Sequence, residues 1–106
     1  MGLFVASSTR QSLIAEKNEL EHKVMLIKEA KMELANSTKD LVNAGSDLDP
    51  DSVTVKELNM RKERLNNLER KLDMELAEYQ ARLEMVNGLM QEAKRKESEA
   101  IKDMYS

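Results

Sequence analysis

The sequence predicts an all-α fold, an elongated antiparallel hairpin made of two coiled-coil helices. Apolar residues recur at every seventh position in two runs, and the only proline of the chain lies between the runs. Such spacing keeps one narrow apolar stripe of a helix turned towards a second helix. With 35% charged and 3% aromatic residues, the composition is typical of long helices and argues against a β-rich fold. The first run consists of Leu13, Leu20, Ile27, Leu34 and Leu41, and the second of Leu58, Leu65, Leu72, Tyr79, Val86, Ala93 and Ala100.

The first predicted helix covers residues 8–44 and follows an apolar N-terminal tip formed by residues 1–7. Ser8 and Gln11 have the spacing of a capping box, in which the two side chains satisfy free backbone N–H groups at a helix start. Gly45 marks the end of this helix, because glycine tolerates the left-handed conformation that often terminates a helix.

The second predicted helix covers residues 51–103 and follows a turn over residues 45–50, so the whole chain forms a single helical hairpin. Asp49 can accept hydrogen bonds as an N-cap residue, and the fixed φ of Pro50 suits the first position of a helix. Ser52 is an alternative N-cap.

Asn87-Gly88 is the one interior interruption in the second helix. Such a dipeptide is typical of turns, and a break at this point would create a third short helix. The apolar pattern nevertheless passes through Gly88 with its phase unchanged, which favours one continuous helix.

We expect the chain to fold back in the predicted turn so that the apolar positions of the two helices face each other. Leu41 then lies opposite Val55, and Leu3 lies near Ala93, which leaves residues 97–106 with no partner inside the hairpin. The predicted seam, the stripe through which the two helices meet, consists of Leu13, Leu20, Val24, Ile27, Leu34, Leu41, Val55, Leu58, Leu65, Leu72, Leu76, Tyr79, Leu83 and Val86.

Each heptad has a second position that faces the seam, between the seven-spaced apolar residues, and several of these positions are polar. Among them, Lys31 is expected one layer from Glu69. Two helices with such a seam bury little apolar surface, so we expect further copies of the chain, and other protein subunits, to cover the hairpin. The alternative interpretation is scattered surface hydrophobes and frayed chain ends. The candidate assembly interface consists of Leu3, Phe4, Val5, Met25, Met32, Leu68, Met74, Ala77, Ala81, Met85, Leu89, Ile101, Met104 and Tyr105.

No pattern in the sequence predicts a catalytic, cofactor, metal or small-molecule substrate site. The chain has no cysteine, and its single histidine, His22, lacks partners for a metal site or a catalytic triad. The segment from Asp47 to Asp51 resembles the start of a calcium loop, but Ser52 and Leu58 occupy the positions that require Gly and Glu. These acidic residues are better explained as a complement to the helix dipole.

Basic residues form two clusters, but the net charge of -3 disfavours nucleic acid as a partner. In the second predicted helix three acidic residues stand four positions before a basic residue, so the sequence predicts that much of its basic charge is paired along the helix surface. The predicted pairs are Glu57 with Arg61, Glu78 with Arg82, and Glu92 with Lys96.

The longest apolar run, residues 3–6, is shorter than a signal sequence or a membrane-spanning helix requires. We therefore expect synthesis in the cytoplasm without a cleavable signal and no membrane span. Export by a dedicated machine and incorporation into a surface or virion assembly are the alternatives to a cytoplasmic location.

Two classes of function fit these observations. In the first, the chain is a non-enzymatic structural subunit that assembles with itself into a filament, a tube or a larger bacterial or virion assembly. In the second, it is a soluble coiled-coil binding module, such as a secretion chaperone, stalk or adaptor, that docks a partner helix.

The hairpin layout, with Asp49-Pro50 before the second helix, resembles the small helical-hairpin subunits of bacterial secretion filaments, including type III secretion needle proteins. The resemblance covers the layout only. This chain is longer than needle subunits, and it has no tryptophan for the Trp-X-Gly turn found in another class of secreted hairpins. The resemblance implies a filament subunit connected with secretion.

Overall fold

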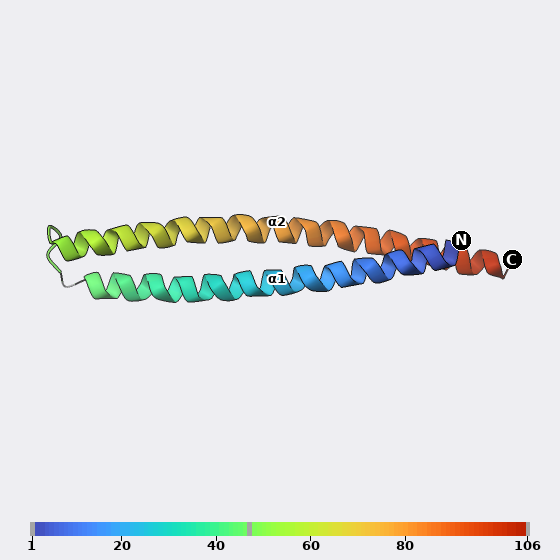
Figure 1. Cartoon of the computed structure of the whole chain (residues 1–106), viewed down its shortest axis with the longest axis horizontal. Helices are drawn as coiled ribbons and strands as arrows, with labels where there is room; N and C mark the ends of the chain where they lie inside the picture. Colours follow the sequence, from blue (N-terminus) through green and yellow to red (C-terminus); the bar gives the residue numbers. More distant parts are fainter. Residues whose placement is uncertain (1, 47, 106) are drawn as a thin grey trace. The chain divides into compact units, whose positions relative to one another are not determined.

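A computed structural model describes residues 2–46 and 48–105, and over this range the chain consists of two α-helices (Figure 1). Helix α1 covers Gly2–Gly45 and helix α2 covers Val53–Met104. No strand occurs among the described residues, which confirms the all-α prediction. Met1 of the predicted tip and Asp47 of the predicted turn lie outside the described residues.

The contacts of the chain divide it into two units. The terminal unit contains Met1–Val24 and Glu78–Ser106, and the turn unit contains Met25–Ala77. In the terminal unit Gly2 lies against Ala100 and Lys23 lies over Tyr79, while in the turn unit Lys31 pairs with Asp73 and Gly45 lies against Leu58. In each unit a later residue of α1 meets an earlier residue of α2, so the helices are antiparallel, as the sequence predicts.

The predicted start of the first helix at Ser8 is wrong, because α1 begins at Gly2 and passes through Ser8. The apolar stripe extends further towards the N-terminus than the leucine run suggests. Residues 2–7 of the predicted tip are the first part of α1. Leu3 is half-buried and Ala6 is 7% exposed, whereas Phe4 and Val5 are exposed.

Gly45 ends α1 as predicted, but not through a left-handed conformation, since no described glycine has a positive φ. The carbonyl oxygen of Asn43 instead accepts hydrogen bonds from Ser46, from Oγ at 2.9 Å and from the backbone N–H at 3.4 Å. These bonds satisfy a carbonyl of the last turn, which has no partner within the helix.

The second helix begins at Val53 rather than at residue 51 and ends at Met104. Ser52 is the N-cap, because its Oγ accepts a hydrogen bond from the Val55 N–H at 3.2 Å. Asp49 acts earlier in the connection, where its Oδ1 accepts a hydrogen bond from the Asp51 N–H at 3.1 Å. Helix α2 continues through Gly88 without a break, in agreement with the preferred interpretation of the sequence.

The predicted register of the terminal unit is wrong by one heptad. The prediction places Leu3 near Ala93, whereas a Cβ built on the adjacent Gly2 would lie 3.3 Å from the Cβ of Ala100. Glu97, predicted to have no partner within the hairpin, forms an ion pair with Arg10. The last turns of α2 are therefore packed against α1 as far as Ala100.

The turn unit shows the same shift. The predicted register places Gly45 opposite Asp51, but the structure places it against Leu58, where a built Cβ would lie 3.4 Å from Cδ1. A slip of seven residues keeps every layer in the same heptad phase, so the apolar pattern alone does not distinguish the two registers. The first turn of α2 projects past the end of α1, and the connection over residues 46–52 has the length to allow it.

All residues of the predicted seam are buried or half-buried. This holds although the seam was predicted with the two helices in the other register. The most deeply buried is Val86, with 1% exposure. Two small residues complete the core among the described residues, which consists of Ala6, Leu20, Ile27, Leu34, Val86 and Ala93.

Candidate assembly surfaces

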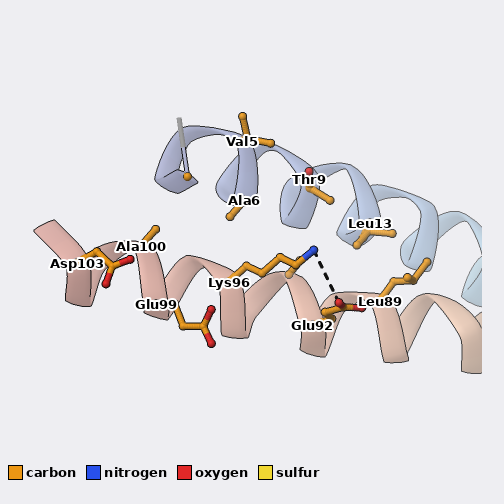
Figure 2. Close-up of a pocket in the computed structure, with 12 residues that line it drawn as sticks. Val5, Ala6, Thr9, Leu13, Leu89, Glu92, Lys96, Glu99, Ala100 and Asp103 are labelled. Atoms are coloured by element: carbon orange, nitrogen blue, oxygen red, sulfur yellow. Dashed lines mark ion pairs between the residues drawn. The ribbon is translucent and has the colours of Figure 1, made fainter.

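A groove with an apolar floor runs between the start of α1 and the end of α2 in the terminal unit (Figure 2). Its volume is about 550 Å³. Ala6 and Leu13 point towards α2 in this view. Three of the lining residues are alanines, Ala6, Ala93 and Ala100, whose side chains fill less space than leucine would. The apolar and small lining residues are Gly2, Val5, Ala6, Thr9, Leu13, Leu89, Ala93 and Ala100; we call this site the apolar groove.

Charged side chains of α2 line the same groove: Glu92, Lys96, Glu99 and Asp103. Lys96 reaches back to Glu92 at 3.7 Å, as Figure 2 shows, and Arg95 pairs with Glu99 at 2.6 Å. The lining thus contains three carboxylates and one ammonium group, so the groove combines an apolar floor with an acidic edge.

A second groove of about 430 Å³ lies in the terminal unit and is lined mostly by polar residues. Its lining includes three basic side chains, from Arg10, Lys17 and Lys94, and one large apolar side chain, from Met90. Because the Arg10 guanidinium is already bonded to Glu97, this groove has less unpaired charge than its composition suggests.

The predicted assembly residues lie on the surface with one exception. Leu3 is half-buried in the seam, and the other thirteen are exposed. The exposed fractions are largest at Tyr105 (86%), Phe4 (82%) and Met74 (74%). The groove contains two of the predicted residues, Val5 at 51% exposure and Leu89 at 44%.

Ion pairs cross the seam in both units. In the terminal unit Arg10 Nε lies 2.7 Å from Glu97 Oε2. In the turn unit the Lys31 ammonium pairs with Asp73 rather than with the predicted neighbour Glu69. The hydrogen bond to Asp73 raises the pKa of Lys31 above its ordinary value of 10.5, and the negative charges of Asp73 and Glu69 add to this effect, whereas desolvation opposes it.

Two of the three ion pairs predicted along the helix surface are present. Arg82 lies 3.4 Å from Glu78, and Lys96 pairs with Glu92. Among the described residues Arg61 forms no ion pair, so the predicted neutralisation by Glu57 is wrong. This cation belongs to the first basic cluster of the sequence, which lies on α2 in the turn unit and is consequently more strongly charged than the sequence suggests. The cluster consists of Arg61, Lys62, Arg64, Arg70 and Lys71.

The described residues contain no cluster of side chains that could hold a metal ion. His22 is exposed, and no group of three or more His, Asp or Glu side chains in residues 2–46 and 48–105 is arranged to hold a metal ion. Over the same residues, neither helix contains a stretch both long and apolar enough to cross a membrane.

The apolar groove is the feature that the sequence analysis missed. Its lining includes three alanines at heptad positions, Ala6, Ala93 and Ala100, and Ala93 and Ala100 belong to the apolar run identified in the sequence. The predicted register kept Ala6 away from Ala100, so the groove was not visible. The sequence does contain a signal for the groove: the heptad positions change from leucine to alanine at the start of the first helix, at Ala6, and near the end of the second, at Ala93 and Ala100.

Comparison with known proteins adds no relative to this description: no protein-family model, curated protein or solved structure matches the chain. The surfaces of the two units are therefore the basis for inferring a function.

Proposed function

We propose that this chain is a non-enzymatic structural subunit that assembles with further copies of itself through the apolar side chains exposed on α1 and α2. The single observation that carries the proposal is the imbalance between buried and exposed apolar groups. Among the described residues six apolar side chains are buried, and sixteen large apolar side chains are exposed.

This imbalance matters because apolar burial is the main favourable contribution to folding. Each buried leucine or methionine side chain contributes about 1.5–3 kcal/mol relative to exposure. Two helices with six buried apolar residues have a small core, and two of these six are alanines. Association through exposed residues such as Met32, Met74 and Met85 removes further apolar surface from water and stabilises the helices that contain them.

The exposed residues are suited to helix packing. Methionine side chains are flexible and fill irregular contacts, and exposed alanines such as Ala77 and Ala81 allow a second helix to approach closely. The resemblance of the sequence layout to secretion-filament subunits extends the proposal to a filament or tube subunit, with export as part of the same proposal.

The test is the association of the purified full chain. We expect sedimentation velocity and light scattering to show species that grow with protein concentration, and negative-stain electron microscopy to show their form. Helix content measured by circular dichroism should rise as the protein associates, because the hairpin alone is marginal. A stable monomer over the whole accessible concentration range would exclude the proposal.

The apolar groove favours a second candidate function, the docking of an amphipathic helix from a different protein. A groove with an apolar floor and a charged edge is a recurrent binding mode for such helices. The two functions are separated by the same sedimentation experiment, because a binding module remains monomeric when purified alone, whereas a structural subunit associates.

A further inference from the structure

One face of α2 in the turn unit combines basic and apolar side chains. Met60, Leu68 and Met74 are 54%, 45% and 74% exposed. Their positions alternate along the helix surface with three exposed cations, and no described residue forms an ion pair with any of the three. We define the basic face by these six residues, Met60, Arg61, Arg64, Leu68, Lys71 and Met74.

The apolar groove of the terminal unit has the complementary chemistry. Its floor is apolar, and its edge contains the carboxylates of Glu92, Glu99 and Asp103 and the ammonium group of Lys96, while Arg95 lies beside this edge and pairs with Glu99. Glu92 and Glu99 form only exposed pairs within their own helix, at 3.7 Å and 2.6 Å. Exposed pairs of this kind contribute about 0–1 kcal/mol, so an intermolecular cation can replace or share them at little cost.

We propose that the apolar groove of one copy binds the basic face of a second copy. This inference rests on the proposed self-assembly and names the surfaces that carry it. The apolar side chains of the basic face, such as Leu68, enter the groove beside Val5 and Leu89, and the cations lie along its acidic edge. A helix face seated in a groove between two helices is an established mode of recognition.

The dimensions of the two surfaces agree. Arg61 and Lys71 lie about 15 Å apart along the axis of α2, and Glu92 and Asp103 lie about 17 Å apart along the same helix. The cations can therefore lie against the carboxylates over the length of the groove.

Two copies could also meet through their two grooves, in a symmetric contact, and charge distinguishes this arrangement from the contact of a groove with a basic face. Groove against groove would bring Glu92, Glu99 and Asp103 near the same residues of the other copy, and like charges at close range disfavour association. Groove against basic face pairs opposite charges. Because the two surfaces differ, the contact is heterologous, and such contacts propagate into rings or open filaments when they repeat.

The test uses charge reversal and complementation with the full chain. The face variant carries Arg61→Glu, Arg64→Glu and Lys71→Glu, and the groove variant carries Glu92→Lys, Glu99→Lys and Asp103→Lys. We expect each variant alone to associate at least 10-fold more weakly than the wild type in sedimentation velocity at low salt. An equimolar mixture should recover association, because the reversed groove and the reversed face attract each other.

A matched control separates this contact from the effect of net charge. The variant with Lys28→Glu, Lys39→Glu and Lys56→Glu changes the net charge by the same amount as the face variant, at exposed residues outside both surfaces. It should associate as the wild type does. A milder face variant with Arg61→Gln, Arg64→Gln and Lys71→Gln preserves helix propensity and should weaken association several-fold even if the Glu variant does not fold.

The outcomes are distinct. If the wild type does not associate at all, the proposed function fails. The next outcomes assume that the wild type associates and that circular dichroism shows both variants to be folded. If each variant alone then associates as well as the wild type, or if their mixture does not recover association, this contact is excluded while self-assembly stands. If the groove binds a different protein and does not bind a second copy of this chain, the proposed contact is also excluded.

Discussion

The Arg10 guanidinium donates two hydrogen bonds to the Glu97 carboxylate across the seam, from Nε to Oε2 at 2.7 Å and from Nη2 to Oε1 at 3.5 Å. Both residues occupy heptad positions that an uninterrupted coiled coil would fill with apolar side chains. In the alternative register, one heptad away, Arg10 would lie near Val86 and have no such partner. The pair therefore selects one register from two that share the same apolar layers.

We predict that Arg10 and Glu97 are energetically coupled. Glu97→Gln and Arg10→Gln should each destabilise the protein, and the double variant should lose less than the sum of the two, with a coupling of about 0.5–1 kcal/mol. Urea unfolding followed by circular dichroism measures the three free energies. A double variant whose loss equals the sum would show that the contact does not contribute to the choice of register.

The register itself can be tested by disulfide formation, since the chain has no cysteine of its own. Gly2→Cys with Ala100→Cys should form an intramolecular disulfide under mild oxidation, because a Cβ at residue 2 lies 3.3 Å from the Ala100 Cβ. Gly2→Cys with Ala93→Cys serves as the control and represents the alternative register. Preferential oxidation of the second pair, detected by mass spectrometry, would contradict the register described here.

Heptad spacing identified positions that are buried or half-buried, because it reports the buried face of a helix directly, but the predicted seam omitted Ala6 and Ala93, which belong to the core. Leu20, Ile27 and Val86 are buried as the pattern indicates, and α2 passes through Gly88 because the apolar phase does not change there. Secondary structure and seam membership are local properties of the pattern.

The register and the apolar groove could not be predicted in the same way. A shift by seven residues leaves every heptad position equivalent, so the pattern gives no preference, and the difference comes from the connection and from pairs such as Arg10 with Glu97. The groove follows from the register, because only the observed one brings the N-terminal end of α1, with Gly2 and Ala6, against Ala100.

We expect Ser52 to be the residue that caps α2. Ser52→Ala should cost about 1 kcal/mol, because the Val55 N–H loses its acceptor at the helix start. Ser8→Ala is the matched control. Ser8 was expected to cap the first helix but lies inside α1, where alanine is the better helix former, so this variant should be neutral or stabilising by about 0.5 kcal/mol. Equal losses at the two serines in thermal unfolding would contradict the helix boundaries.

The pair of Lys31 with Asp73 predicts a dependence of stability on alkaline pH. Asp73 raises the pKa of Lys31 above 10.5, so the stabilisation is fully present below this value and is lost as pH rises through the raised pKa of the folded state. The free energy of unfolding of the wild type should exceed that of Asp73→Asn at neutral pH, and the difference should disappear at high pH. Comparison with the variant cancels the titration of the other lysines. A difference that persists above the raised pKa would exclude this ion pair as its source.

Gly88 provides a test of both stability and assembly. A Cβ built there has no neighbour within 4 Å, and its φ is not positive, so Gly88→Ala should stabilise α2 by about 1 kcal/mol through helix propensity alone. Ala81→Gly, one heptad earlier on the same exposed face, is the reciprocal control and should destabilise by a similar amount.

Sedimentation velocity of the Gly88→Ala variant then tests whether another helix packs against this part of the α2 surface. We expect association equal to that of the wild type, because Gly88 belongs neither to the apolar groove nor to the basic face. Weaker association of a more stable chain would instead show that another helix packs closely against Gly88.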